Sequence, residues 1–202
     1  MPFSASEPIP RKEKITVSYM VQKLRERVQL NLTACTSGDC AQYRYVYEVD
    51  LHRPGMALAG YTDLFTYKRI QIIGNTETQF LDNLSPTEQT NAFKNITAFD
   101  LPVIFLTDGN KLADNLIKLA EEASIPIYTT PVETTRFMYL LRDFLEDQFA
   151  TQTMVHGAMV DVYGIGILIA GKSGIGKSEV ALDLIERGHR LVADDVVMLT
   201  KK

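Results

Sequence analysis

The sequence predicts an α/β protein: an N-terminal α/β domain with a largely parallel sheet, followed by the first part of a second α/β domain. Three observations support this. Short apolar segments alternate with amphipathic ones over residues 69–150. A glycine-rich segment lies between an apolar run and an amphipathic one at residues 165–185. The composition, 46% hydrophobic and 23% charged, is typical of globular domains.

The first fifty residues predict a leader and a few short elements. Residues 1–14, with three prolines and no apolar core, are expected to form a mobile leader rather than a secretory signal. Ser18 is a candidate N-cap for a helix that ends near Val28. Strands are expected over Gln29–Thr33 and Tyr43–Val49, and Leu51–Gly55 is expected to be a loop.

Helices and strands then alternate up to residue 150. Apolar runs predict strands over Arg69–Ile73, Pro102–Leu106 and Ile125–Tyr128. Helices are expected over Thr76–Leu81, from Ser85–Pro86 onward, over Lys111–Ala123 and over Glu133–Ala150.

The pattern changes after residue 150. Met154–Val162 alternates as a strand does, Tyr163–Gly164 is a candidate tight turn, and Ile165–Ala170 is an apolar strand. We therefore expect two domains, residues 1–150 and 151–202.

Charge and composition exclude several classes of function. The formal net charge is −4, so a chain-wide excess of basic residues, typical of nucleic-acid binding, is absent. No apolar run reaches the ~20 residues needed to cross a bilayer. Cys35 and Cys40 do not have a zinc or thioredoxin spacing and are expected to be reduced thiols in a turn. With no signal sequence, we expect a cytoplasmic protein. His52 is a lone loop histidine and is expected to be a surface or structural residue rather than a ligand.

One motif carries recognisable chemistry. The residues Gly171, Lys172, Ser173, Gly174, Ile175, Gly176, Lys177 and Ser178 match G-x-x-x-x-G-K-[ST] between a predicted strand and a predicted helix, which is the context that a P-loop requires. The helix has Val180, Leu182, Leu184 and Ile185 as its apolar residues and ends at Gly188. Such a loop binds ATP phosphates with its backbone N–H groups. Lys177 is expected to contact the β/γ-phosphates, and the Ser178 hydroxyl to ligate Mg²⁺.

Two carboxylates follow the next predicted strand, Arg190–Ala193. If that strand lies beside the P-loop strand in a parallel sheet, Asp194 and Asp195 face the phosphates. One of them could hold Mg²⁺ through water, and the other could accept a proton from an attacking hydroxyl. Paired aspartates at a strand end also occur as ordinary turn residues, and from composition alone His156 is a core or surface histidine.

The sequence resembles the bacterial HPr kinase/phosphorylase family. The resemblance rests on His156–Gly164, the P-loop GKSGIGKSE and ERGHRLVADDVV from Glu186 to Val197, and it extends to RPGMALAGY (Arg53–Tyr61) and RIQIIG (Arg69–Gly74). Lys172 stands where an acidic residue is often found in the family.

The resemblance implies a P-loop kinase that uses ATP to phosphorylate a serine of the phosphocarrier HPr, and that reverses this step with inorganic phosphate, releasing pyrophosphate. It implies that His156, Lys177 and Asp195 are catalytic, with Asp195 as the acid/base group, and that Asp194 acts on Mg²⁺. It also implies a homo-oligomer, a hexamer in the family.

The chain is expected to be a truncated form of such a protein. The 52 residues from 151 to 202 are too few to close a P-loop sheet with helices on both faces. The family pattern continues with a Glu that ligates Mg²⁺, a catalytic Arg and a segment for dephosphorylation. Two alternatives stay open: another P-loop kinase with a small-molecule acceptor, and a non-catalytic regulatory module that only binds nucleotide.

Overall fold

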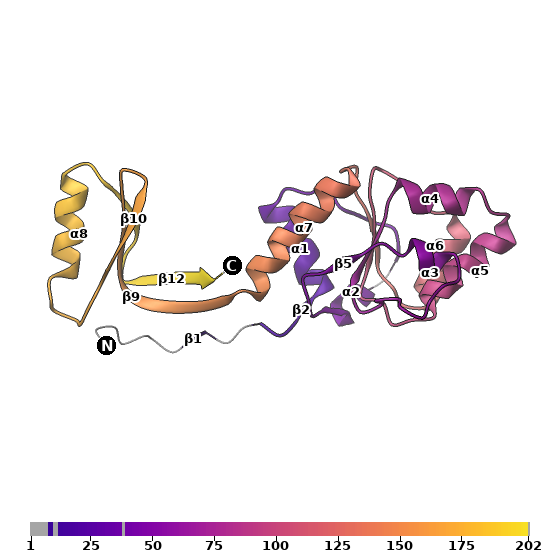
Figure 1. Cartoon of the computed structure of the whole chain (residues 1–202), viewed down its shortest axis with the longest axis horizontal. Helices are drawn as coiled ribbons and strands as arrows, with labels where there is room; N and C mark the ends of the chain where they lie inside the picture. The colour runs from indigo at the N-terminus through magenta and orange to yellow at the C-terminus, as the bar shows by residue number, and fades with distance from the viewer. Residues whose placement is uncertain (1–7, 10–11, 38, 202) are drawn as a thin grey trace. The chain divides into compact units, whose positions relative to one another are not determined.

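The computed structural model describes residues 8–9, 12–37 and 39–201 (Figure 1). They form two compact units. The larger is Glu13–Phe149, and the smaller is Ala150–Lys202 together with the short strand β1 (Pro8–Ile9). Most of the expected leader lies outside the described residues. Its described residues Pro8 and Ile9 pair with Thr153 and Gln152, which the leader's composition did not predict.

The larger unit is built on a five-stranded sheet in the order β3-β8-β7-β6-β5. The four strands β5 to β8 are parallel, and only the edge strand β3 is antiparallel. This confirms the predicted α/β class with a largely parallel sheet. The elements of this unit are β2 Ile15–Thr16, α1 Val17–Arg27, β3 Thr33–Ala34, α2 Cys40–Tyr43, β4 Tyr45–Val46, β5 Leu51–His52, α3 Gly55–Leu58, β6 Ile70–Ile73, α4 Asn75–Asp82, α5 Pro86–Thr97, β7 Ile104–Leu106, α6 Asp114–Glu122, β8 Ile127–Thr129 and α7 Thr134–Phe149.

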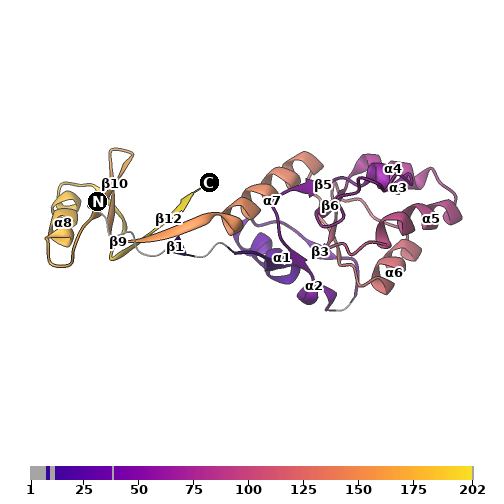
Figure 2. The ribbon, with the colours of Figure 1, turned by 60° about the horizontal axis from the view of Figure 1, so that its bottom comes forward.

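Helices cover both faces of this sheet. Ile70 and Ile72 of β6 pack with side chains of α1 and α7, whereas Ile73 of the same strand packs with α3, α4, α5 and α6. Figures 1 and 2 show the two groups of helices on opposite sides of the strands. A strand buried on both faces needs a largely apolar sequence. β7 is entirely apolar, and β6 is apolar except for the buried Gln71.

Local sequence signals predicted some of these elements correctly and others incorrectly. Ser85 caps α5 as predicted: it and Glu88 form a reciprocal capping box. The first helix begins earlier than expected, because the Thr16 hydroxyl rather than Ser18 caps it, accepting from the Tyr19 N–H at 3.2 Å. Leu51–His52, expected to be a loop, is strand β5. Its two residues pair with β6, a distant segment that local sequence does not reveal.

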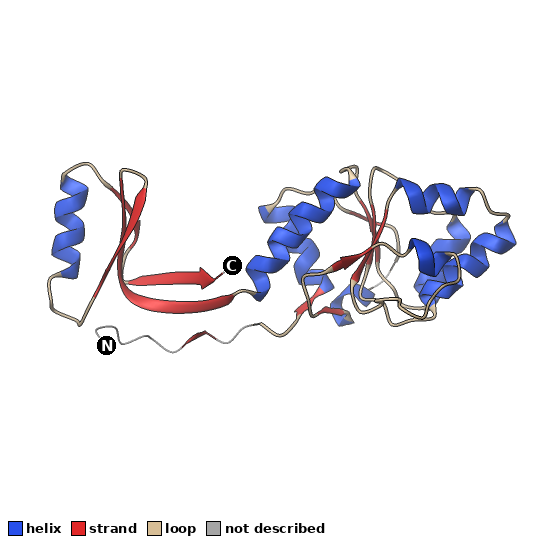
Figure 3. Cartoon of the chain, viewed as in Figure 1, coloured by secondary structure: helices blue, strands red, loops and turns tan. Residues whose placement is uncertain are grey.

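The smaller unit is organised around one long strand, β9 (Thr151–Val162). Val160 of β9 pairs with Ile167 of β10 (Ile165–Ala170) and with Leu191 of β11 (Arg190–Ala193), so these two strands lie on opposite edges of β9. β12 (Val196–Lys201) continues along the edge that β11 occupies (Figure 3). At the predicted β9–β10 turn, Tyr163 and Gly164 both have positive φ angles, 54° and 84°, as a two-residue hairpin turn requires.

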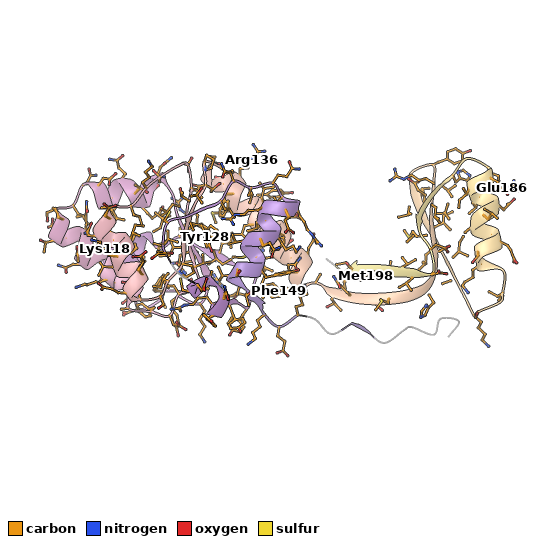
Figure 4. All side chains as sticks on the ribbon, turned by 180° about the vertical axis from the view of Figure 1, so that it is seen from behind. Lys118, Tyr128, Arg136, Phe149, Glu186 and Met198 are labelled. Carbon is orange, nitrogen blue, oxygen red and sulfur yellow. The ribbon has the colours of Figure 1, made fainter. Side chains whose placement is uncertain are left out.

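The apolar core of the smaller unit is small. Ala158 and Val160 of β9 pack against Ala181 of α8 (Lys177–Glu186). The prediction for this helix was partly wrong, because Val180 and Leu182 are exposed and Ala181, which the pattern omitted, is buried. Other large apolar side chains are also exposed, among them Met198 of β12 (Figure 4). No helix among the described residues is long and apolar enough to cross a membrane.

Arg44 connects three segments of the larger unit. Its guanidinium donates to the carboxylate of Asp100 and to the carbonyl oxygens of Leu101, Ala123 and Ser124, the last three at 3.0–3.1 Å. These acceptors lie in the loops that precede β7 and β8. The side chain is only 17% exposed, so water cannot readily replace these bonds.

We therefore expect Arg44→Met to lower the free energy of unfolding by about 1–3 kcal/mol, because it leaves several carbonyl groups without their donor. Equilibrium urea unfolding measures this. Arg136→Met is the matched control, since the Arg136 side chain is exposed (Figure 4), and it should change stability by less than about 0.5 kcal/mol. Equal stability of the two variants would contradict the role given to Arg44.

Candidate functional site

The glycine-rich segment forms a loop between the end of β10 and the start of α8. Gly174 and Gly176 have φ angles of +79° and +93°, a region that L side chains rarely adopt, so these two positions require glycine. Gly176 is the N-cap of α8 and supplies no capping side chain. The first N–H groups of the helix are therefore available to an anion, and the helix dipole favours negative charge there.

Lys177, the first residue of α8, reaches back over this loop. Its Nζ donates to the carbonyl oxygen of Lys172 at 2.9 Å. The ammonium group is thus held beside the backbone that a phosphate would contact. Ser178 follows in the first turn of the same helix. This arrangement suits a polyphosphate ligand.

A cavity of about 1450 Å³ brings most of the predicted site residues together. Its lining includes His156, the loop residues from Gly171 to Ser178 except Ile175, and both Asp194 and Asp195. The Ile175 side chain is instead 69% exposed. The cavity also has lining residues that sequence reasoning missed, namely Thr153, Val155, Gly157, Ala158, Leu168, Ala170, Glu179, Val196 and Leu199.

Strand pairing accounts for two of the missed residues. Thr153 and Leu199, which both line the cavity, are partners across the β9–β12 pair. The alternation in β9 and β12 could have indicated that their side chains share a face. It could not indicate that the phosphate loop lies next to that face.

The two aspartates lie where β11 ends and β12 begins. The register against β9 shifts by one residue between Leu191 and Ala193, which marks a bulge. Asp195 has a φ of +65°, and Asp194 Oδ1 accepts from the Asp195 N–H at 3.0 Å. The carbonyl oxygen of Asp195 accepts from the Gly157 N–H at 3.1 Å.

The expected neighbour relation of the strands was wrong. β11 does not lie beside the P-loop strand β10, because β9 separates them. Both strands run antiparallel to β9 and are therefore parallel to each other. Their carboxyl ends still lie at the same end of the sheet, although the two strands flank opposite sides of β9. Asp194 and Asp195 consequently meet the phosphate loop through a different topology from the one expected.

The residues proposed for Mg²⁺ are compatible with that ion. Ser178 and Asp194 both line the cavity and offer a hydroxyl and a carboxylate, the oxygen ligands that Mg²⁺ prefers. Among the described residues there is no cluster of three or more His, Cys, Asp or Glu side chains that could hold a metal ion. Mg²⁺ that binds with a nucleotide needs few protein ligands, because phosphate and water oxygens complete its shell.

The other polar residues considered from sequence lie in the larger unit. The His52 ring lies 5.6 Å from the Phe65 ring, and burial, aided by the charge of Arg69, lowers the pKa of His52. Cys35 and Cys40 are free thiols, and burial raises the pKa of Cys35. These environments are those of structural residues.

The strand–loop–helix unit facing a carboxylate pair defines a P-loop protein with a candidate nucleotide site. Comparison with known proteins specifies the family. A family profile described as HPr Serine kinase N terminus matches residues 15–145, and one described as HPr Serine kinase C-terminal domain matches residues 147–202. The chain belongs to the HPr serine kinase family, which confirms the resemblance drawn from its motifs.

Curated relatives agree with this assignment. The HPr kinase/phosphorylase of Chloroherpeton thalassium is 54% identical over 192 residues, covering 95% of this chain and 56% of the relative. That of Chlorobium luteolum is 52% identical, covering 95% and 58%. The chain therefore spans little more than half the length of these relatives. We use the term full-length protein for a protein that contains this chain and has the length of these relatives.

A solved structure was also similar. The crystal structure of the CBS and DRTGG domains of the regulatory region of Clostridium perfringens pyrophosphatase aligns with a TM-score of 0.48 and 13% identity, over 94% of this chain and 73% of that one. This similarity is too low to support an inference.

Lys177→Ala should weaken binding of ATP to the full-length protein by about 10- to 100-fold, because a charge-assisted hydrogen bond to phosphate is worth roughly 1.5–3 kcal/mol. Isothermal titration calorimetry gives the dissociation constant. Lys201→Ala removes an exposed lysine of the same unit and should leave affinity unchanged. If Lys177→Ala bound ATP as tightly as Lys201→Ala, the phosphate-binding role of the loop would be wrong.

Proposed function

We propose that the full-length protein transfers the γ-phosphoryl group of ATP to a serine of HPr and reverses this transfer with inorganic phosphate. The cavity that joins the phosphate loop to Asp194 and Asp195 carries the proposal. Relatives that are 52% and 54% identical and are named HPr kinase/phosphorylase support it. As part of the same proposal, the protein has domains over residues 1–150 and 151–202, uses Mg²⁺ and works as a cytoplasmic homo-hexamer.

In the forward direction the serine oxygen bonds to the γ-phosphorus and the bond to the β-phosphate oxygen breaks. Lys177 and the loop N–H groups balance the charge on the phosphates. Ser178, and Asp194 through water, would hold Mg²⁺, which when bound neutralises further phosphate charge. Asp195 accepts the serine proton, and His156 lines the same cavity.

In the reverse direction inorganic phosphate attacks the phosphoserine. Its oxygen bonds to the phosphorus, the bond to the serine oxygen breaks, and pyrophosphate forms. Asp195, in its protonated form, donates a proton to the serine oxygen, and the proton that the attacking phosphate loses restores Asp195 to that form. One carboxylate can serve both directions because each reaction makes or breaks the bond between the serine oxygen and the phosphorus, and the proton of that oxygen is transferred with it.

Asp195→Asn tests this assignment in the full-length protein. Asparagine cannot accept the serine proton, so both reaction rates should fall by about 10²- to 10⁴-fold, while ATP affinity changes only a few-fold. Asp194→Asn is the matched variant and should act mainly through Mg²⁺ and nucleotide affinity. Both rates and the ATP dissociation constant are measured for each. If Asp195→Asn lost only affinity and Asp194→Asn only turnover, the two roles would be reversed.

The 202-residue chain by itself should bind nucleotide weakly and should not phosphorylate HPr. It spans 56–58% of its relatives, and its smaller unit has exposed apolar side chains around a core of few residues. The test measures the rate of phosphate transfer by this chain and by the full-length protein. The acceptors are HPr and nucleosides or metabolites. Rapid transfer to HPr by the 202-residue chain would contradict the expectation. Transfer only to a small acceptor would favour a small-molecule kinase. If neither protein transferred phosphate to any acceptor, a regulatory module would be favoured.

A further inference from the structure

Gly157 of β9 contacts both halves of the candidate site. On one edge it pairs with Ala170, the last residue of β10 before the phosphate loop. On the other edge its N–H donates to the carbonyl oxygen of Asp195 at 3.1 Å. Gly157 therefore lies between the strand that carries the loop and the bulge that carries the carboxylates.

This position has no room for a side chain. A Cβ atom on Gly157 would lie 2.3 Å from the carbonyl oxygen of Ile169, 3.2 Å from its carbonyl carbon and 3.3 Å from the Cα of Ala170. All three are backbone atoms, so no rotamer change can relieve the clash. Its φ angle is not among the positive ones of the described residues, so spacing rather than backbone conformation requires glycine here.

A second glycine of the same strand pair provides a comparison. Gly166 of β10 pairs with Asp161, and a Cβ atom there would lie 2.5 Å from the terminal methyl of Met159. A methionine side chain has three rotatable bonds and can move aside. A methyl group at position 166 is therefore accommodated by a rotamer change of Met159, whereas one at position 157 must displace the end of β10.

We propose that Gly157 is a positioning residue that sets the distance between the phosphate loop and the Asp195 carboxylate. The inference rests on the proposed function. A methyl group at 157 pushes Ile169 and Ala170 away from β9, and the loop that follows moves with them. The internal geometry of the loop is unchanged, so phosphates still bind. The distance from the bound phosphoryl group to Asp195 increases, and a displacement of about 1 Å can cost roughly 10²-fold in rate.

The experiment compares Gly157→Ala with Gly166→Ala in the full-length protein. For Gly157→Ala we expect the turnover number with HPr to fall about 10- to 100-fold, with the ATP dissociation constant within about three-fold of the unmodified protein. Gly166→Ala should keep both values. Thermal unfolding of both variants shows whether they fold. Unchanged turnover, or an equal loss of affinity and turnover, in Gly157→Ala would overturn the inference.

A double variant separates positioning of Asp195 from general damage. If Gly157 acts through Asp195, adding Gly157→Ala to Asp195→Asn should cost less than about three-fold beyond Asp195→Asn itself, measured as residual single-turnover transfer. If the rate losses of the two single variants multiply in the double variant, Gly157 acts elsewhere and the proposal is overturned. If Gly157→Ala does not fold, the Ala170→Gly background, which gives the end of β10 more freedom to retreat, is used for the same comparison.

The proposed function and the positioning role of Gly157 are overturned by different results. If the unmodified full-length protein transfers phosphate to no HPr serine, the proposed function is wrong, and so is the inference built on it. If it transfers phosphate but Gly157→Ala behaves like Gly166→Ala, the proposed function stands and only the positioning role is lost.

Discussion

The pairing of β9 along both of its edges determines where every residue of the candidate site lies. β9 receives β10 on one edge and β11 and β12 on the other, so the phosphate loop and the aspartate pair come to the same place from opposite sides. Backbone hydrogen bonds of a sheet have nearly constant length. The separation of the two functional groups is therefore set mainly by backbone, and side chains adjust it little.

The two units use different physical means to hold their sheets. In the larger unit, β6 and β7 are buried between two layers of helices, and apolar packing on both faces stabilises the parallel pairing. In the smaller unit, the buried apolar cluster is limited to Ala158, Val160 and Ala181, so the antiparallel hydrogen bonds of β9 carry a larger share of its organisation. An open setting of this kind leaves space for a charged ligand beside the strands.

The sequence correctly predicted those strand bounds and helix starts that are determined by residues next to them in the chain. Ile165–Ala170 and Arg190–Ala193 were predicted with the observed bounds, because an apolar run or a glycine marks their ends. Ser85 followed by Pro86 predicted the start of α5, because a cap residue before proline at the first helical position is a local signal. Strand β5 and the position of β9 between β10 and β11 were missed. Both depend on which distant segments pair, and a single sequence does not encode that as a local pattern.

The left-handed backbone at Asp195 has a consequence for which amino acids can serve there. With φ at +65°, most side chains would cost about 1–2 kcal/mol, whereas aspartate and asparagine, whose short polar groups bond to nearby backbone, are accepted more readily. Glutamate carries the same charge on a longer chain and lacks this advantage. The curvature of the bulge thus favours the shorter of the two acids, so backbone shape as well as chemistry limits which residue can serve at this position.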